Sequence, residues 1–564
     1  MSIIKTKLNE KLSVTGQISV DDLAEIAAAG YKSVICNHPD YEGGETQPTS
    51  AQLEQAARSL GLQFVYLPVE IGAVSTEKSD AFNKLLAELP RPMLAFCKSS
   101  NRSKALHEMT GQKQEKPEGE AESVTAACSG TGEAPATTQL PPPSEEKLLP
   151  LIPACNWGNA FDIVVIGGGA AGIGVTASLL HRQPSLRIAI IEPSDKHYYQ
   201  PAWTLVGGDA YDIAQTVRNM SDVIPPKAEW IQVAANGFDP DHNLVHLVDG
   251  RSIGYRQLIV CPGIRLAWKK IEGIQQTLGK NGVTSNYQFE LAPYTWSLTQ
   301  NLKRGKAMFT QPPIPIKCAG APHKPMYLSC DHWLRQCVLD NIEVEFNSAA
   351  AVLFSVADFV PSLMKYVQRY HAKLAFNSNL IKVDDPNRIA TFEIKDSEGK
   401  VTLVEKPFDM LHVTPPQVAP DFLSNSLLAD AIGFCEVNPK TLQHTRYPNI
   451  FSLVDACSSS NTKTAAAARK QIAIVADNLL AAREGRKLPD IYDGYGGCPL
   501  TVEKGKVILA EFGFGGKLLP TFPFFDPTAP SRFAWLLKVK VFPWLYWNGM
   551  LKGREWLTRS TGVS

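Results

Sequence analysis

The sequence DIVVIGGGAAG, from Asp162 to Gly172, decides the fold of most of this chain. It predicts a buried strand, a glycine turn and the start of a helix, with Gly167, Gly169 and Gly172 filling the pattern G-x-G-x-x-G. The first glycine makes a tight turn, the second lets a pyrophosphate approach the backbone, and the third lets the helix pack on the strand. The N–H groups of the helix N-terminus around Ala171 would then hold the phosphates.

A second apolar run supports this interpretation of the glycine turn. Residues 186–191 are mostly apolar and end in Glu192, about 20 positions after the turn, where an acidic residue commonly bonds the ribose hydroxyls of a dinucleotide. The alternative is an ordinary βαβ unit that binds no ligand. The residues expected to hold the cofactor are Gly167, Gly169, Ala171, Gly172 and Glu192.

The composition is that of an ordinary globular protein with several domains. At 564 residues the chain should hold three or four units of roughly 150 residues each. Lysine plus arginine equals aspartate plus glutamate, at 56 each, so nucleic acid is not expected as a partner. The sequence shows neither the apolar run of a signal peptide nor a stretch long enough to span a membrane. The eleven cysteines form no paired C-x-x-C pattern, so neither a disulfide scaffold nor a metal site is predicted.

Residues 1–110 are predicted to form a compact α/β domain that carries a reactive cysteine. A buried strand over residues 92–96 delivers Cys97, and a short loop leads from it through Arg102 into a helix. The loop N–H groups and the Arg102 guanidinium can hold an oxyanion, and the helix dipole lowers the pKa of the Cys97 thiol. The unit resembles the small tyrosine-phosphatase-like domains, and its loop also resembles the active-site loop of rhodaneses.

The loop length separates the two activities that this resemblance implies. Four residues lie between Cys97 and Arg102, which is the rhodanese-like spacing and shorter than that of tyrosine phosphatases. A tighter cradle suits a persulfide or thiosulfate better than a phosphoester, so sulfur transfer by Cys97 is favoured, with Arg102 holding the anion. Phosphatase activity is the second hypothesis, and an inert cysteine in a helix cap is the third.

Residues 111–157 are expected to tether this domain to a second unit, residues 158–564. They are rich in Glu, Ser, Thr, Gly and Pro and carry few large apolar side chains. Such a segment cannot offset its ordering entropy by burial, so it is predicted to be disordered or extended.

Five further motifs in the second unit show a resemblance to a known family. They are His197–Gly207, Ile316–Pro322, Met410–Pro416, Thr462–Ala467 and Tyr492–Tyr495. Together they are similar to the sulfide:quinone oxidoreductases, and most of all to the branch that includes the mitochondrial enzyme, over about residues 160–557. The whole chain looks like bacterial fusions of a phosphatase-like domain with an FAD-dependent oxidoreductase.

The resemblance implies an α/β fold with two Rossmann-like domains of the flavoprotein disulfide reductase type and a C-terminal region that faces a membrane. It also implies that Lys463 supports negative charge on the reduced flavin. The residues implied to contact FAD in this part of the fold are Pro262, Gly263, Asp455 and Lys463. The resemblance also implies how residues 158–564 are divided. The FAD-binding parts are about 158–300 and 430–485, the Rossmann-like middle part is about 301–429, and the membrane-docking region is about 490–564.

In this family two cysteines near the flavin accept sulfide across their disulfide and pass two electrons to FAD and then to quinone. Cys318 matches the first cysteine. The second directly follows an aspartate in the family, whereas here Ala456 takes that place and Cys457 follows. Because a one-residue shift near a strand end can turn a side chain to the opposite face, Cys457 pairs with Cys318 only if the turn is rearranged. Otherwise Cys318 acts alone or with Cys330 or Cys337, on a persulfide or polysulfide.

The middle domain lacks the second glycine turn of NAD(P)H-dependent relatives. The strand containing residues 307–309 runs into a segment with prolines at 312, 313 and 315. Proline has no N–H, so this turn cannot hold a pyrophosphate, and NADH is not expected as the electron donor.

The C-terminal region mixes aromatic and cationic residues, mainly at 522–525 and 533–547. This composition favours the lipid headgroup level without spanning the bilayer. A peripheral place on the cytoplasmic face of an inner membrane is expected, assuming bacterial origin, with a quinone pocket that includes Tyr495. A core helix or a dimer contact is the alternative, so a homodimer stays open.

The leading hypothesis is a membrane-associated FAD enzyme that oxidises sulfide or a sulfane-sulfur compound and reduces quinone, with Cys97 taking over the product persulfide. The second is a phosphatase joined to an FAD-dependent oxidoreductase or sensor that no longer uses sulfide. The third is a membrane-recruited scaffold in which FAD is structural.

Overall fold

The protein divides into two compact units, Met1–Gly158 and Asn159–Ser564, and each is described by itself. The linker predicted for residues 111–157 and the loop residues 98–101 lie outside the described part of the chain. The structure is a computed structural model that describes residues 6–9, 11–40, 47–69, 76–97, 102–103, 106–107, 160–396, 398–460, 462–522 and 524–558.

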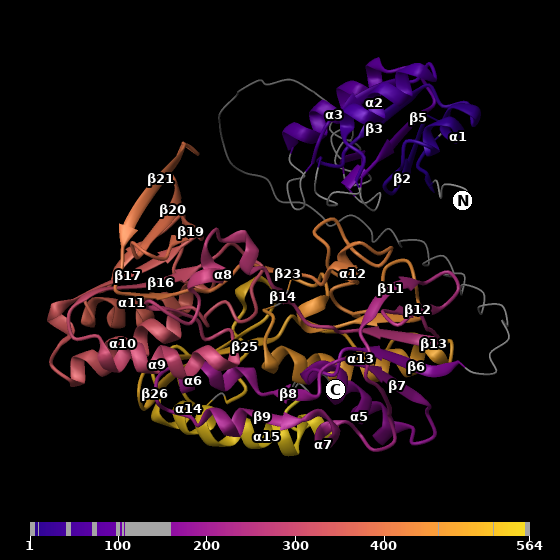
Figure 1. The fold of residues 1–564 in the computed structure, drawn as a ribbon. Helices are drawn as coiled ribbons and strands as arrows, with labels where there is room; N and C mark the ends of the chain where they lie inside the picture. The colour runs from indigo at the N-terminus through magenta and orange to yellow at the C-terminus, as the bar shows by residue number, and fades with distance from the viewer. Residues whose placement is uncertain are drawn as a thin grey trace, which may run out of the picture. The chain divides into compact units, whose positions relative to one another are not determined.

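The first unit is an α/β domain built on one five-stranded sheet (Figure 1). The strand order is β1-β2-β5-β3-β4, in which β1 is antiparallel to β2 and the others are parallel. The strand predicted before Cys97 is confirmed as β5. The elements are β1 (Thr6–Lys7), β2 (Leu12–Thr15), α1 (Asp22–Ala28), β3 (Ser33–Cys36), α2 (Ser50–Ser59), β4 (Gln63–Tyr66), α3 (Thr76–Glu88) and β5 (Met93–Phe96).

Strands β3 and β5 end at the same edge of this sheet. Cys36 is opposite Phe96 in their register, so Cys97 follows directly beside the end of β3. Both strands are buried along their whole length, as parallel strands covered on both faces are.

The second unit begins with the predicted strand, turn and helix. Parallel strands β10, β7, β6, β13 and β24 lie in that order, and β12 and β11 extend the sheet beyond β13 in antiparallel fashion. The elements around this sheet are β6 (Phe161–Ile166), α5 (Ala170–Arg182), β7 (Ile188–Ile191), β10 (Glu229–Ile231), β11 (Ala235–Asp239), β12 (Leu244–Leu247), β13 (Ser252–Val260), β24 (Ile450–Ser452) and α13 (Ala465–Arg483).

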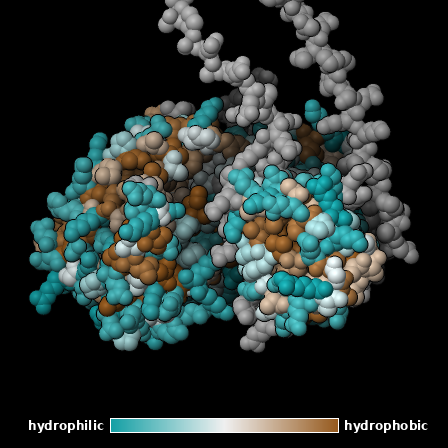
Figure 2. Space-filling view, turned by 90° about the horizontal axis from the view of Figure 1, so that it is seen from above, coloured by the Kyte–Doolittle hydropathy of each residue, from teal (hydrophilic) through white to brown (hydrophobic). Residues whose placement is uncertain are grey.

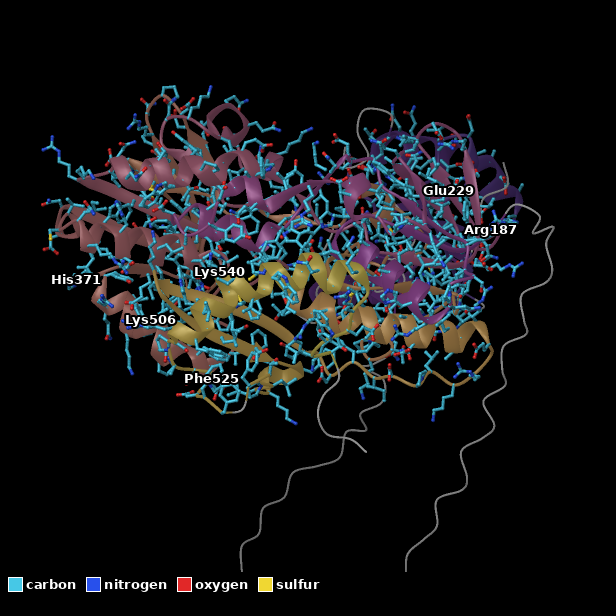
Figure 3. All side chains as sticks on the ribbon, turned by 90° about the horizontal axis from the view of Figure 1, so that it is seen from below. Arg187, Glu229, His371, Lys506, Phe525 and Lys540 are labelled. Atoms are coloured by element: carbon cyan, nitrogen blue, oxygen red, sulfur yellow. The ribbon has the colours of Figure 1, made fainter. Side chains whose placement is uncertain are left out.

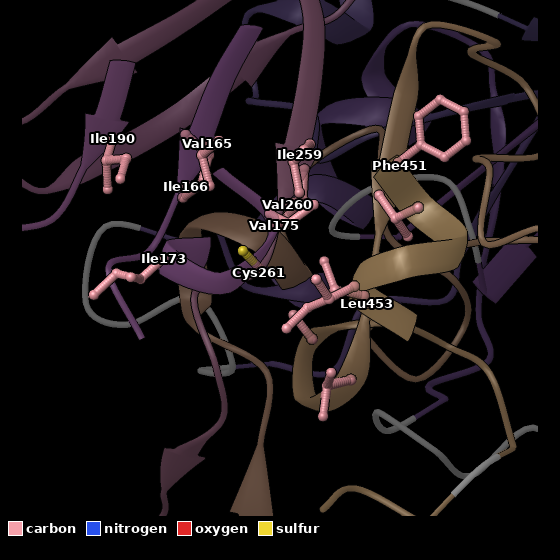
Figure 4. Close-up of a cluster of buried hydrophobic side chains, with 14 of the residues drawn as sticks. Val165, Ile166, Ile173, Val175, Ile190, Ile259, Val260, Cys261, Phe451 and Leu453 are labelled. Atoms are coloured by element: carbon pink, nitrogen blue, oxygen red, sulfur yellow. The ribbon is translucent and has the colours of Figure 1, made fainter. Parts of the chain in front are cut away.

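The core of this part lies between the sheet and its two helices. Figure 4 shows branched and aromatic side chains in a row across neighbouring strands, from Ile190 through Val165 and Ile259 to Phe451. Helix α5 packs against α13, and both helices start at the same end of the parallel strands. This end of the sheet is where α/β folds place their ligands.

The middle part is a second Rossmann-like layer, with the parallel sheet β15-β22-β16-β17-β18 and an antiparallel sheet β19-β20-β21. Its elements are β15 (Val283–Thr284), α9 (Ala292–Asn301), β16 (Gly305–Gln311), α10 (His323–Arg335), β17 (Ile342–Ser348), α11 (Val360–Arg369), β18 (Lys373–Ala375), β19 (Ser378–Asp384), β20 (Ile389–Lys395), β21 (Val401–Pro407) and β22 (Met410–His412). Short connecting elements are β8 (Lys196–Tyr198), α6 (Trp203–Val206), β9 (Val217–Asn219), α7 (Met220–Val223), β14 (Arg265–Leu266), α8 (Ile274–Thr277), β23 (Gln417–Val418) and α12 (Asp421–Ser424).

The C-terminal segment folds back onto both preceding parts. The hairpin of β25 (Gly496–Glu503) and β26 (Lys506–Phe512) packs on α10 and shares the core of the middle part. It leads into α14 (Arg532–Leu536), the π-helix η9 (Leu537–Val541) and α15 (Phe542–Asn548). In Figure 3 these helices, in yellow, cross the face turned to the viewer, where Lys540 and Phe525 are labelled.

The described helices include none that is both long and apolar enough to cross a bilayer. On the face shown in Figure 2, hydrophobic side chains are scattered in small areas among hydrophilic ones.

Candidate active site

The glycine turn has the geometry that a bound pyrophosphate requires. Gly167 has φ +102°, and a Cβ added to Gly172 would lie only 1.9 Å from the Gly167 carbonyl oxygen, so helix and strand touch there. A Cβ on Gly169 would meet nothing within 4 Å, because this glycine faces open space. A phosphate can therefore approach the backbone at Gly169, as the sequence predicts.

Glu192 directly follows β7 and faces the turn. Its carboxylate accepts hydrogen bonds from the N–H groups of Gly168 and Ser194, each at 2.8 Å. An acidic side chain held beside the glycine turn fits a ribose hydroxyl.

A cavity of about 520 Å³ extends from this turn to the C-terminal helices. Gly167 and Gly172 shape the turn rather than line the cavity. Pro262 and Gly263 come soon after β13, and Gly263 has φ +79°, a left-handed value that glycine adopts readily. The predicted site residues that line the cavity are Gly169, Ala171, Glu192, Pro262, Gly263, Cys318, Asp455 and Lys463.

Lys463 and the start of α13 bring positive charge to one wall of this cavity. The Lys463 ammonium donates to the carbonyls of Val454 and Cys457, at 3.2 and 2.9 Å. Thr464 caps α13 by accepting from the Ala467 N–H at 3.1 Å, which leaves the positive end of a 19-residue helix at the cavity. Such a wall fits a flavin that becomes anionic when reduced.

Cys318 lies beside Lys463, whose carbonyl accepts the Cys318 N–H at 2.8 Å, and it has a strained backbone conformation. Its φ is +57°, a left-handed value that a residue with a side chain adopts at some expense and that is common at functional sites. Its Sγ lies 2.9 Å from the Sγ of Cys498 in β25, and both thiols are free. The two sulfurs need to approach by less than about 1 Å to form an S–S bond.

Two buried lysines face this thiol pair. The ammonium of Lys324, in the first turn of α10, donates to the Cys318 sulfur at 3.3 Å. Lys538 reaches in from the π-helix η9 and donates to the Pro499 carbonyl at 3.0 Å. A π-helical turn often marks a functional site, and here it carries a buried cation to the cavity.

These contacts make the two thiols unequal. The hydrogen bond from Cys498, together with Lys324, holds the pKa of the Cys318 thiol well below its usual range. The same hydrogen bond and burial raise the pKa of Cys498. Burial lowers the pKa of Lys538, with Lys324 adding to the effect, whereas the nearby sulfurs outweigh burial and raise the pKa of Lys324. Cys318 is therefore the thiolate of the pair.

The sequence left open whether Cys318 pairs with Cys457, Cys330 or Cys337, and in the structure the sulfur next to Cys318 is that of Cys498. Cys457 is fully buried in the core of the FAD-type sheet, and its thiol donates to the Val454 carbonyl at 3.3 Å. Cys330 is buried inside α10, and Cys337 is exposed beyond its end.

Sequence reasoning missed Cys498 because it is 180 residues from Cys318. One signal was available: Cys498 comes three residues after Tyr495, within reach of the motif 492–495. Lys324 and Lys538 were also missed, since neither has a local pattern that marks it as buried.

In the first unit, Cys97 is fully buried at the end of β5. Arg102 is also buried, and its guanidinium donates to the Val69 carbonyl. Ser103 donates to the Asn37 amide oxygen at 2.9 Å, which ties this segment to the end of β3. The loop N–H groups of the predicted anion cradle belong to residues 98–101, outside the described residues.

Comparisons with known proteins agree with the division of the chain into two units. The model for the Beta-lactamase hydrolase-like protein, phosphatase-like domain, matches residues 5–113, and the Pyridine nucleotide-disulphide oxidoreductase model matches residues 161–296. The mitochondrial sulfide:quinone oxidoreductase of Mus musculus is 38% identical over 399 residues, covering 71% of this chain and 88% of that protein. That of Dictyostelium discoideum is 40% identical over 407 residues, covering 72% and 88%.

The solved structure of the sulfide:quinone oxidoreductase from Aquifex aeolicus has a TM-score of 0.57 at 19% identity, covering 69% of this chain and 92% of that chain. It shares the fold. A Beta-lactamase hydrolase-like protein of Agrobacterium fabrum is 32% identical over 101 residues, which are 18% of this chain and 23% of that protein. The first unit thus spans about a quarter of that relative.

The fold and the cavity define an FAD-dependent oxidoreductase of the flavoprotein disulfide reductase type. Within that class, the chain belongs to the sulfide:quinone oxidoreductase family, because its second unit covers most of relatives that are more than 30% identical. It carries, in addition, an N-terminal phosphatase-like domain.

Proposed function

We propose that this protein oxidises sulfide and reduces quinone, with Cys318 and Cys498 as its redox pair. The observation that carries the proposal is the 2.9 Å approach of the two sulfurs at a cavity that also holds the glycine turn. A persulfide or polysulfide as the substrate is the narrower alternative.

The inequality of the two thiols sets the direction of sulfide attack. In the oxidised protein the sulfurs form a disulfide, and hydrosulfide attacks the Cys498 sulfur. The S–S bond breaks, the Cys498 side chain becomes a persulfide, and the Cys318 sulfur leaves as a thiolate. A thiol of low pKa leaves faster, and Lys324 holds its negative charge.

The persulfide then passes its outer sulfur to an external thiolate or sulfite, which leaves a thiolate on Cys498. The two thiolates can then re-form their disulfide, which yields two electrons for a cofactor held at the cavity. When bound, FAD accepts these electrons and passes them to quinone. Gly169, Glu192 and Asp455 would hold the dinucleotide, and Lys463 would balance the charge of its reduced form.

The C-terminal aromatic face is the proposed contact with the membrane. It consists of exposed large apolar side chains around α14 and α15, among which Phe524 is 74% and Trp544 53% exposed. Lys540 lies on the same segment (Figure 3). Its other members are Phe533, Leu536, Trp556 and Leu557.

This face would give a lipid-soluble quinone a path into the cavity, which Phe522, Phe542 and Leu545 continue inward. Attachment is thus peripheral, with the cytoplasmic face of an inner membrane as the proposed side. Replacing Phe524 and Trp544 with serine should release the protein from anionic vesicles in a flotation assay. Equal flotation of both proteins would contradict this placement.

The N-terminal domain is proposed to accept the product sulfur on Cys97, since tethering raises the effective concentration of one site at the other. The match to a phosphatase-like domain favours aryl phosphate hydrolysis as the second candidate. A Cys97→Ser protein separates them: loss of persulfide products supports transfer, and loss of phosphatase activity supports the alternative. An unchanged rate and product set would contradict the sulfur hand-off.

The central test is anaerobic and follows the flavin spectrum. Sulfide should bleach the purified protein, and a short-chain ubiquinone should restore the oxidised spectrum. Reduction by dithionite with no bleaching by sulfide would overturn the proposed function.

A further inference from the structure

A buried carboxylate lies in the cavity and has no part in the sulfur chemistry. Glu511, in β26, is 5% exposed and lines the cavity together with Tyr495 and Thr521. Its carboxylate accepts a hydrogen bond from the Tyr495 hydroxyl. It accepts two more from Thr521, one from the hydroxyl at 2.5 Å and one from the backbone N–H at 2.9 Å. The group is therefore held in one place by a network of hydrogen bonds.

The charges around this network are on its Tyr495 side. The Arg469 guanidinium donates to the Tyr495 hydroxyl at 3.3 Å, and the Lys470 ammonium lies 4.1 Å from the centre of the Tyr495 ring. Lys470 also pairs with Asp493 at 3.6 Å. Burial, with Glu511 next, raises the pKa of Tyr495. All hydrogen bonds described for the Glu511 carboxylate come from uncharged donors.

The position of the network is what a quinone-reducing site needs. The cavity wall around it is apolar, with Leu509, Phe522 and Phe542 leading towards the C-terminal aromatic face. A quinone ring entering from that face has few polar groups to meet. Burying a carboxylate among such residues is unfavourable unless it is compensated by hydrogen bonds, and the fold provides them.

We propose that Glu511 is a catalytic residue that delivers a proton to a quinone oxygen, with Tyr495 and Thr521 as its positioning residues. This inference rests on the proposed function and adds a proton donor to it. Reduction of a quinone to a quinol takes two electrons and two protons. FAD, when bound and reduced, would supply the two electrons and one proton. The second proton reaches the quinone oxygen through Glu511: its carboxylate takes up a proton from water by way of Thr521 and passes it on, so that Glu511 ends as the carboxylate again.

The test separates the two half-reactions in the holoenzyme of a Glu511→Gln variant. The amide keeps the size of the side chain and can still accept from Thr521, but it cannot give up a proton. We expect flavin bleaching by sulfide and the Kd of a short-chain ubiquinone, measured by fluorescence quenching, to be unchanged. Reoxidation of the bleached protein by that quinone should be about 100-fold slower at neutral pH.

Two further readouts distinguish proton delivery from a structural role. Reoxidation of the variant should slow as pH rises, because protons must then come from the solvent, and a small carboxylic acid added to the buffer should restore part of the rate. Tyr495→Phe should show a weaker form of the same pH dependence. The matched control is Glu503→Gln, since Glu503 is a buried carboxylate on β25 that pairs with Arg369 and Lys506 outside the cavity.

Reoxidation of Glu511→Gln at the normal rate and with the normal pH profile would overturn the proposal. So would a slower rate explained fully by a weaker Kd, since Glu511 would then only bind quinone. If sulfide fails to bleach the unsubstituted protein, the proposed function fails, but quinone reoxidation after dithionite reduction still tests Glu511.

Discussion

The second unit contains two pairs of neighbouring cysteines, and they have opposite surroundings. Cys318 and Cys498 meet at the cavity, where Lys324 donates to a sulfur. Cys435 and Cys457 lie side by side in the core of the sheet that contains β24, and both are fully buried. Burial raises the pKa of both core thiols, whereas the thiol of Cys318 has a lowered pKa.

A lysine is also close to the core pair of cysteines, so a nearby positive charge alone does not explain why the thiols of the two pairs differ in pKa. The Lys463 ammonium near Cys457 donates to backbone carbonyls, and the Cys457 thiol donates to another carbonyl. Lys324 instead donates to the sulfur itself. Thiol chemistry therefore depends on where the hydrogen bonds of the cation go and on access from a cavity.

The largest effect is expected from removing one member of the cavity pair. Cys498→Ala should slow sulfide-driven bleaching by roughly four orders of magnitude, because no disulfide remains to be attacked. Stopped-flow spectroscopy measures it, with Cys457→Ala as the control that keeps the normal rate. A normal rate in Cys498→Ala with a slow rate in Cys457→Ala would identify Cys457, and not Cys498, as the redox partner of Cys318.

Selective alkylation tests the same contrast without turnover. In the reduced protein at neutral pH, iodoacetamide should modify Cys318 at least about 100-fold faster than Cys435 or Cys457, because only the cavity thiol is a thiolate with access to solvent. Mass spectrometry of timed digests gives the rates. Equal rates at all three positions would show that the pairs do not differ.

Lys324 is expected to set the reactive pH range. Its ammonium lowers the pKa of Cys318, so Lys324→Met should raise that pKa. The rise of the alkylation rate with pH should then be centred roughly 1–3 pH units higher than in the unsubstituted protein. At neutral pH the variant is therefore slower and recovers at alkaline pH. An unshifted profile would leave the hydrogen bond from Cys498, together with Lys538, as the cause of the lowered pKa.

The smallest effect is expected in the core pair. Cys457→Ala removes one buried sulfur and should lower the free energy of unfolding by about 1 kcal/mol, measured by denaturant titration. Bleaching by sulfide should not change. A loss of bleaching at normal stability would give Cys457 a catalytic part.

Local patterns were sufficient for the elements that hold the dinucleotide. The buried strand, the turn at Gly167 and the helix after it were predicted together, and the structure confirms them as β6, the turn and α5. They depend on residues close together in the chain, through the steric fit of glycine.

The cysteine pair could not be predicted in that way. Reasoning from the residue after Asp455 left Cys457 as one of several open partners, because it considered only positions near the expected one in the chain. The structure places Cys498 next to Cys318, since β25 packs on α10, whose first turn carries Lys324.

By itself the sequence determined the family and the glycine turn with Glu192 after it, and it predicted Cys318 as a site residue, because each of these depends on short runs of neighbouring residues. Only the tertiary structure decided which sulfur and which cations face Cys318. Cys498 is 180 residues away from Cys318 in the chain, and Lys538 is farther still. Hairpin pairing and core packing bring both of them next to Cys318. Packing of distant segments is a property of the whole fold, so no local pattern of residue types could reveal it.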